Sequence, residues 1–251
     1  MTPCFFVSDL HGKVDRYKKL FELIRDERPQ AVFIGGDILA SGLMPLTEFE
    51  PDHQDFINDF LVSGFKALRE SLGQQYPQIF LILGNDDGRA VEAAILDVAT
   101  EGIWKYVHNR RVRFKEFMVY GYAYVPPTPF QLKDWERYDV SRFVDPGCIS
   151  PEDGFHSFPV SKRELKFSTI QRDLEWLGGD EALDRAVFLF HTPPYQTSLD
   201  RAALDGKMID HVPLDVHVGS IAVKRFIENR QPLLTLHGHI HESARLMGSW
   251  K

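Results

Sequence analysis

The sequence has few cysteines: only Cys4 and Cys148 occur among its 251 residues. Two thiols cannot form the disulfide framework of a small secreted protein, so this count favours a reducing compartment. The N-terminus also lacks the basic segment and the long apolar segment of a secretory signal. We therefore expect a cytoplasmic protein in which both cysteines are simply buried.

Long apolar runs and an excess of positive charge are absent as well. No segment approaches the roughly 18 consecutive apolar residues of a membrane span. The formal net charge is -7, so no overall positive field attracts nucleic acid or anionic lipid. A phosphate-bearing substrate is still compatible with this charge, because bound metal cations dominate the field of a site. One small basic cluster, Arg110-Arg111, Arg113 and Lys115, predicts a solvated hairpin rather than contact with nucleic acid.

What the sequence does contain is a regular alternation of apolar runs and amphipathic segments. Apolar residues make up 43 % of the chain, enough to bury a large core. Short apolar runs predict strands over 4–7, 31–34, 79–83, 107–112, 117–125, 186–190 and 233–236. Helical spacing of apolar residues predicts helices over 14–27, 52–71, 89–100, 168–177 and 220–228. The alternation indicates an α/β protein, which we expect to be a single domain over residues 1–251.

The Pro-rich segment 126–159 breaks this alternation, because it shows no periodicity. We predict a long ordered loop or cap inserted in the domain. Loops of this length are often functional, so a cap that shapes a substrate pocket is one interpretation and a passive surface excursion is the other.

Five short polar clusters are the most informative feature, and each of them follows a predicted strand. They are Asp9-Leu-His11, Gly35-Gly-Asp37, Gly84-Asn-Asp-Asp87, His191-Thr-Pro193 and Gly238-His-Ile-His241. Ligands of α/β sheets collect beyond the carboxyl ends of the strands, so these distant clusters are expected to converge. Asp9 and His11 are two residues apart, which would place both side chains on one face of an extended segment. His239 and His241 have the same spacing.

The donor types in these clusters point to a divalent-metal centre. Carboxylate, amide and imidazole donors suit Mn²⁺, Fe or Zn²⁺ better than soft-ligand metals, and the number of imidazoles argues against Ca²⁺. A carboxylate such as Asp37 can bridge two cations about 3.5–4 Å apart. We therefore predict two divalent ions as cofactors, with Mn²⁺ favoured and Fe, Zn or Ni as alternatives. The competing interpretation is a coincidence of turn residues, since Asp, Asn and Gly favour the ends of strands.

The ordered set of clusters resembles the calcineurin-like metallophosphoesterase superfamily. Its motifs are Asp-x-His, Gly-Asp, Gly-Asn-His-Asp/Glu, a lone His and Gly-His-x-His, and the match runs from residue 9 to residue 241. The small bacterial and archaeal phosphohydrolases are the most similar. The Gly-Asp-x-Val-Asp-Arg-Gly run of the eukaryotic Ser/Thr phosphatases is absent after Gly36-Asp37. The resemblance implies a two-sheet sandwich flanked by helices, a four-layer αββα fold, with the metals at the carboxyl ends of the strands.

The resemblance also implies a role for each position. The first metal would be held by Asp9, His11 and His241, and the second by Asn85, His191 and His239. Asp37 would bridge the two metals, and Asp37, Asn85 and Asp86 would be the catalytic residues. A hydroxide held by the metals would attack the phosphorus of a small-molecule phosphodiester or phosphomonoester. The alternatives are a nuclease of the same superfamily, which needs a basic groove, and a binding scaffold without activity.

Two features depart from the family pattern. Asp86 stands where the family has a His that protonates the leaving group or holds the phosphate. An Asp has a reference pKa near 3.9 and is a poor acid at neutral pH, so we expect a preference for good leaving groups. Relatives usually continue after the last His pair with a strand and an Asn-Pro-Gly turn, whereas ten residues follow His241. Either the sequence is trimmed there or the sheet edge is finished differently.

Several other residues are weaker candidates. Arg89 and Tyr195 follow two of the clusters and are open to two interpretations, substrate contact or a structural role. His217 precedes a predicted helix N-terminus that would suit a phosphate oxygen, although a solvated loop histidine is an equal alternative. His237 is expected to be a packed histidine because it alternates away from the His239 and His241 pair. His108 and His211 carry no pattern and are taken as structural.

Overall fold

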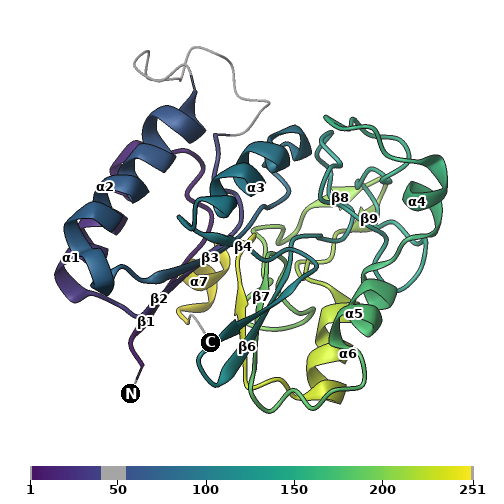
Figure 1. Ribbon diagram of the computed structural model, residues 1–251. Helices are drawn as coiled ribbons and strands as arrows, with labels where there is room; N and C mark the ends of the chain where they lie inside the picture. Colours follow the sequence, from purple (N-terminus) through teal and green to yellow (C-terminus); the bar gives the residue numbers. More distant parts are fainter. Residues whose placement is uncertain (1, 41–54, 250–251) are drawn as a thin grey trace.

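The computed structural model describes residues 2–40 and 55–249, and its centre is a pair of four-stranded sheets (Figure 1). The first sheet is entirely parallel. In spatial order it contains β1 (Cys4–Val7), β2 (Ala31–Gly35), β3 (Gln78–Ile82) and β4 (Lys105–Tyr106). Parallel neighbours need a crossover between them, and the helices predicted between these strands supply it.

The second sheet is mixed. Its spatial order is β10 (Leu234–His237), β7 (Ala186–Phe190), β6 (Phe117–Tyr122) and β5 (Arg111–Phe114). β10, β7 and β6 run parallel, and β5 pairs antiparallel with β6 through a tight hairpin. A separate small hairpin is formed by β8 (Met208–Ile209) and β9 (Val212–Pro213).

The core lies between the two sheets. β2 and β3 of the first sheet contact β7 and β6 of the second. Phe80 on β3 stacks on Phe33 with ring centroids 5.2 Å apart, and it meets the edge of Phe114 at 5.6 Å. Every residue of β2 and β7 is buried, as expected for strands that are covered on both faces.

Helices cover the two outer faces, which gives the four layers seen in Figure 1. α1 (Val14–Glu27) and α2 (Ser63–Leu72) lie on the first sheet, and α3 (Glu92–Thr100) packs beside β4. α5 (Ile170–Gly178) and α6 (Ile221–Arg230) pack together on the second sheet. The buried residues of α1 recur at helical spacing, which is why the sequence predicts it well. The α/β sandwich flanked by helices is confirmed.

Some predicted boundaries are wrong. The strand predicted over 107–112 does not exist as one element, because β4 ends at Tyr106 in the first sheet and β5 begins at Arg111 in the second. Asn109, with a φ of 52°, turns the chain between them. The helix predicted over 52–71 begins in the described part as a π-helical turn (Phe56–Val62), and residues 52–54 lie outside the described residues.

Two short helices were not predicted, and one helix starts later than expected. α4 (Lys162–Phe167) and α7 (Ser243–Met247) are too short to show an apolar stripe in the sequence. The helix expected over 89–100 opens as a 3-10 turn (Arg89–Val91) before α3 begins.

Residues 126–159, all of which the structure describes, contain no helix or extended strand, as predicted. Buried polar contacts order the segment instead. The Lys133 Nζ atom lies 2.6 Å from Glu136 Oε2 and donates to the Thr128 carbonyl at 2.8 Å, and both charged side chains are fully buried.

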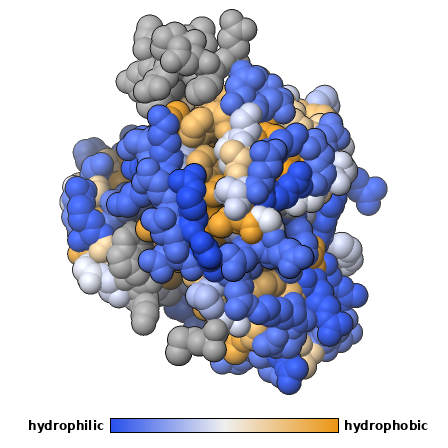
Figure 2. Space-filling model, turned by 60° about the vertical axis from the view of Figure 1, so that its left-hand side comes forward, coloured by the Kyte–Doolittle hydropathy of each residue, from blue (hydrophilic) through white to orange (hydrophobic). Residues whose placement is uncertain are grey.

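The cysteines differ from expectation. Cys4 is exposed, because β1 is the edge strand of the first sheet and turns one side to solvent, and Cys148 is only partly buried. On the face in Figure 2, hydrophilic residues predominate and apolar residues form separate patches. None of the helices within residues 2–40 and 55–249 has the length and apolar character needed to cross a bilayer.

Candidate metal centre

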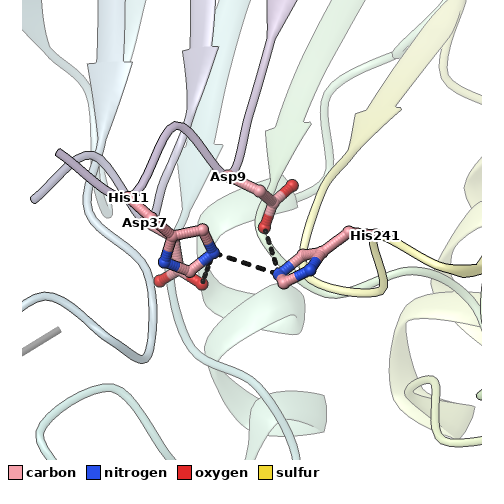
Figure 3. Close-up of side chains that lie close together, drawn as sticks. All are labelled: Asp9, His11, Asp37 and His241. Carbon is pink, nitrogen blue, oxygen red and sulfur yellow. Dashed lines mark hydrogen bonds and ion pairs between the residues drawn. The ribbon is translucent and has the colours of Figure 1, made fainter. Parts of the chain in front are cut away.

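The predicted ligand residues converge at the carboxyl ends of five strands. Asp9 and His11 follow β1, Asp37 follows β2, Asn85 follows β3, His191 follows β7, and His239 and His241 follow β10. The Asp and His residues form two groups, and within each group one donor atom per residue lies within 4.8 Å of the others. The first group is Asp9, His11, Asp37 and His241 (Figure 3). The second group is Asp37, His191 and His239.

In the first group, two imidazole nitrogens face one another. His11 Nε2 lies 3.0 Å from His241 Nε2 and 3.9 Å from Asp37 Oδ2. His241 Nε2 also lies 3.9 Å from Asp9 Oδ1. Burial lowers the pKa of His11 despite the nearby Asp37, so this ring is neutral at pH 7 and carries a nitrogen lone pair. Converging lone pairs and carboxylate oxygens are the arrangement that a divalent cation requires.

In the second group, His191 is held by its far ring nitrogen. Its Nδ1 donates to the Gly35 carbonyl at 2.7 Å, which turns Nε2 toward Asn85 Oδ1 at 3.0 Å and Asp37 Oδ2 at 3.3 Å. Such a carbonyl partner fixes the tautomer and orientation of a metal-binding histidine. Burial by itself lowers the pKa of His191, but Asp37 outweighs it and raises the pKa to about 9. Burial lowers the pKa of His239 to about 3, which leaves that imidazole neutral.

Asp37 is the residue common to both groups. Its Oδ1 accepts the Asp86 backbone N–H at 2.9 Å, and its Oδ2 faces the two imidazoles of His11 and His191. Burial alone raises the pKa of Asp37, but the neighbouring His191 outweighs it and holds the pKa below its usual range. The carboxylate is therefore ionised and only 2 % exposed.

Asp9 and His11 do not lie on an extended segment, so that expectation is wrong. Their φ angles are 57° and 49°, and Asp37 and His239 also adopt left-handed values of 51° and 76°. Such conformations cost about 1–3 kcal/mol each and persist where the surrounding structure enforces them, often at functional sites. His239 and His241 consequently belong to different groups instead of sharing one region of space.

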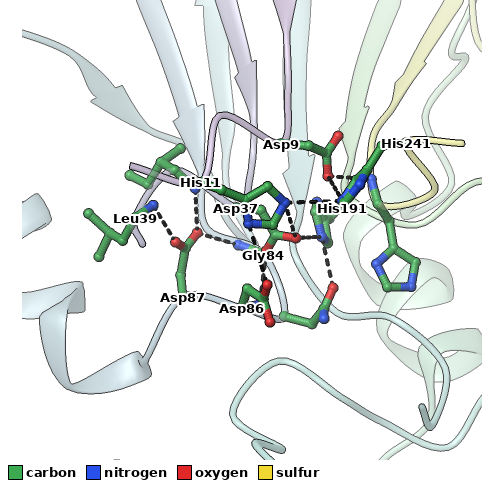
Figure 4. A network of polar contacts seen from close by, with 12 residues as sticks. Asp9, His11, Asp37, Leu39, Gly84, Asp86, Asp87, His191 and His241 are labelled. Carbon is green, nitrogen blue, oxygen red and sulfur yellow. Dashed lines mark hydrogen bonds and ion pairs between the residues drawn. The ribbon is translucent and has the colours of Figure 1, made fainter. Parts of the chain in front are cut away.

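Asp87 is a functional residue that the sequence reasoning missed. Its buried carboxylate accepts three backbone N–H groups, from Leu39 at 2.8 Å, Gly84 at 2.9 Å and Ile38 at 3.1 Å (Figure 4). These bonds join the loop after β2, which carries Asp37, to the loop after β3, which carries Asn85. The sequence did contain a signal for this residue: Asp87 is the last position of the Gly84-Asn-Asp-Asp87 cluster, and no role was assigned to it.

Two glycines allow these loops to approach. A Cβ on Gly84 would lie 2.3 Å from Asp37 Oδ1, and a Cβ on Gly36 would lie 2.6 Å from His191 Nδ1. No side chain fits at such distances, so both positions require glycine for close approach. Gly36 additionally has a φ of 95°.

Asp86, the residue in the place of the family His, borders the first group. Its Oδ2 lies 3.4 Å from His11 Nδ1, and its side chain is 28 % exposed. Burial, assisted by Asp37, raises the pKa of Asp86 above its ordinary value. The site therefore has a partly exposed carboxyl group, that of Asp86, at its rim. Inside it lie the ionised Asp37 carboxylate and the neutral His11 and His239 rings.

The amino-acid sequence matches one protein family over nearly its whole length. The family model for calcineurin-like phosphoesterases matches residues 2–243. The chain belongs to the calcineurin-like phosphoesterase family. A search of curated protein sequences gave no match.

Solved structures with low sequence identity are similar to this calcineurin-like phosphoesterase, and the first of them shares its fold. One crystal structure superposes with a TM-score of 0.55 and 17 % identity, over 95 % of this chain and 84 % of that chain. The protein TT1561 of Thermus thermophilus gives 0.48 and 16 %, over 94 % of this chain and 81 % of that chain. A dimetal phosphatase from Danio rerio gives 0.46 and 14 %, over 95 % and 81 %.

The weaker sequence candidates have structural partners. His237 lies flat against Phe190 with ring centroids 5.4 Å apart, as expected for a packed histidine. His108 is buried, and its Nδ1 accepts the Ala123 backbone N–H at 3.0 Å. His217 Nδ1 pairs with Asp200 Oδ1 at 2.8 Å, so it is not a solvated loop residue.

The helix N-terminus suggested as a phosphate site already has an anionic partner. Both Oδ atoms of Asp139 accept backbone N–H groups of Ile221 and Ala222 at the start of α6, at 2.7–3.3 Å. The suggestion that this end of α6 receives a phosphate oxygen is therefore wrong. Tyr195, the other candidate nearby, donates its hydroxyl to Asp215 at 2.6 Å.

Proposed function

We propose that this protein is a metal-dependent phosphoesterase that hydrolyses a phosphomonoester or phosphodiester of a small molecule. Membership of the calcineurin-like phosphoesterase family supports phosphoester chemistry. The observation that carries the proposal is that the Asp37 carboxylate belongs to both groups of candidate ligands. A shared carboxylate is the element that turns two neighbouring cation sites into one dinuclear centre.

In this proposal, the division of ligands follows the two groups in the structure. The first cation would be held by Asp9, His11 and His241. The second would be held by Asn85, His191 and His239, and Asp37 would contact both. Nitrogen and oxygen donors without thiolates favour Mn²⁺, with Fe, Zn or Ni as alternatives. When bound, the two cations would supply an acidified water and offset negative charge on the phosphoryl oxygens.

The chain's own residues orient the reacting groups. The Gly35 carbonyl fixes the His191 ring. The Asp87 carboxylate joins the two loops that carry Asp37 and Asn85. Asp86, at the rim, is the carboxyl group placed to exchange a proton with the leaving group. Bound cations would counteract the effect of burial on its pKa, so we infer that it is largely ionised, and therefore a poor proton donor, at neutral pH. The Pro-rich segment 126–159 would shape the substrate pocket of a single-domain cytoplasmic enzyme.

A metal assay combined with an activity assay tests the proposal. The protein, freed of metal and reloaded with Mn²⁺, should hydrolyse p-nitrophenyl phosphate or bis(p-nitrophenyl) phosphate. Asp37→Asn should lose at least about a hundredfold in kcat, because the shared charge is gone. Asp97→Asn, on the exposed face of α3, is the matched control and should be fully active. Full activity of Asp37→Asn would contradict the assignment.

The same experiment separates the two rivals. A binding scaffold would take up Mn²⁺ without turning over either ester. A nuclease would associate with DNA in a manner that weakens steeply with salt. The net charge of -7 disfavours that second outcome.

A further inference from the structure

The Pro-rich segment 126–159 is bonded directly to the loop that follows β3. Asp134 is 2 % exposed, and its Oδ2 accepts the Arg89 backbone N–H at 2.6 Å. Its Oδ1 accepts the Ser157 backbone N–H at 2.9 Å, and the Ser157 hydroxyl donates to Asp134 Oδ2. The same hydroxyl oxygen accepts the Ala90 backbone N–H at 3.0 Å. Two consecutive N–H groups, of residues 89 and 90, are thus held by two side chains of the segment.

Trp135 and Phe158, which follow Asp134 and Ser157 in the sequence, hold the Arg89 side chain. The guanidinium carbon of Arg89 lies 5.5 Å from the centroid of the Trp135 ring and 5.9 Å from that of Phe158. Contacts at this range are cation–π interactions. Asp134, Trp135, Ser157 and Phe158 therefore act together on residues 89 and 90, and we call them the 134–158 clamp.

A second anchor holds the other side of the same loop. Asp87 bonds to Leu39 and Gly84, as described above. The clamp begins only two residues later, at Arg89. The loop is consequently fixed along its length, and Asn85 and Asp86 lie within the fixed stretch. The position of Asn85 Oδ1, 3.0 Å from His191 Nε2, depends on that stretch.

We propose that Asp134 and Ser157 are positioning residues that set the second cation position through the Asn85 loop. The inference rests on the proposed function, because it requires Asn85 to be a ligand. Loss of a hydrogen bond that supports a ligand typically weakens metal binding about 10- to 100-fold without removing the ligand itself. Asp9, His11 and His241 have no bond to the clamp among the described residues, so the first cation position should be affected less than the second, through the shared ligand Asp37 and its bond to the Asp86 backbone N–H.

Calorimetric titration of the metal-free full chain with Mn²⁺ tests this inference. Ser157→Ala should weaken one of the two Mn²⁺ binding events about tenfold, and the other by a smaller factor. Ser157→Thr retains a hydroxyl oxygen and should restore the more strongly weakened event. Ser150→Ala is the matched control, since Ser150 bonds to Asp153 in the same segment and contacts no residue of the loop. Amide hydrogen exchange at residues 85–90 should accelerate in Ser157→Ala and not in Ser150→Ala.

The outcomes distinguish the two proposals. A wild-type chain that binds no pair of Mn²⁺ ions would overturn the proposed function, and this inference with it. A wild type that binds two ions, with Ser157→Ala binding both equally well, would overturn the clamp alone. Equal weakening of both binding events, with no faster amide exchange at residues 85–90, would also overturn it, because that pattern reports general destabilisation. Asp134→Asn provides a second variant. In it one carboxylate oxygen is replaced by an amide nitrogen, which cannot accept a hydrogen bond.

Discussion

The Asp87 carboxylate accepts the backbone N–H of Leu39 at 2.8 Å, a bond that joins residues 48 positions apart. Its other oxygen accepts the N–H groups of Ile38 and Gly84. One side chain therefore fixes the spacing between the loop of Asp37 and the loop of Asn85. The Asp86 backbone N–H, which bonds to Asp37 Oδ1 at 2.9 Å, is a second link between these loops. The distance between the two candidate ligands depends on the Asp87 carboxylate together with that bond.

Asp87→Asn should destabilise the protein and loosen the candidate centre. The amide has one accepting oxygen instead of two, so at least one buried N–H loses its partner at a cost of about 1–3 kcal/mol. Urea unfolding should show this loss. Asp97→Asn should change the unfolding free energy by less than about 0.5 kcal/mol. Equal stability of the two variants would show that the three bonds do not hold the loops together.

Gly84→Ala should displace the shared carboxylate. The new Cβ would meet Asp37 Oδ1 at 2.3 Å and the Asp37 backbone nitrogen at 2.6 Å, so Asp37 must move. We expect Mn²⁺ affinity to fall at least about tenfold, measured by calorimetry. Gly88→Ala is the control in the same loop, since its Cβ would be 3.4 Å from Ser157 Oγ, an ordinary contact. If both variants bind Mn²⁺ like the wild type, the close approach of the two loops is not required.

The carboxyl group of Asp86 should make turnover depend on the leaving group. A carboxyl group that is ionised at neutral pH cannot protonate a poor leaving group, so aryl esters with low leaving-group pKa should react fastest. Asp86→His, which restores the residue typical of the family, should raise the rate for alkyl esters by about 100-fold. Rates measured across esters of graded leaving-group pKa test this. A flat dependence in the wild type would contradict the role given to Asp86.

Metal removal should lower thermal stability. A cation that binds only the folded chain adds about 2.7 kcal/mol at a concentration 100 times its dissociation constant. The melting temperature should therefore rise when Mn²⁺ is added to the chelated protein. His191→Ala removes a candidate ligand of the second position and should reduce this rise. An identical rise in the variant would place the bound metal elsewhere.

Glu136 should make stability depend on pH. Burial raises the pKa of Glu136 from 4.5 to about 7, although the Lys133 and Thr128 partners act in the opposite sense. The folded chain then binds a proton more tightly than the unfolded chain, so its contribution is present below pH 4.5 and lost as pH rises to 7. Relative to Glu136→Gln, the wild type should lose up to about 3 kcal/mol between pH 5 and 8. A difference between the two proteins that stays constant over this range would refute the prediction.

Local patterns in the sequence predict most of the fold. The apolar runs of β2, β3 and β7 are recognisable because these strands are covered on both faces. The stripe of α1 is recognisable because only one of its faces is buried. The pattern fails near Asn109, where the chain passes from one sheet to the other. Val107 and Val112 stand in one predicted strand, but Val107 is fully buried beyond the end of β4 and Val112 lies on β5.

The sequence by itself determined which donor atoms are present and which predicted strand each of them follows. Both are local properties, read from residue type and from the apolar run that precedes each cluster. The family resemblance implied how those donors divide, but only the tertiary structure decided which contacts hold them in place. The left-handed turns at Asp9 and His239, the buried carboxylates of Asp87 and Asp134, and the close approach at Gly84 all arise from contacts between distant segments. Such contacts leave no periodic trace in a sequence, since each depends on a few groups brought together by the packing of the two sheets.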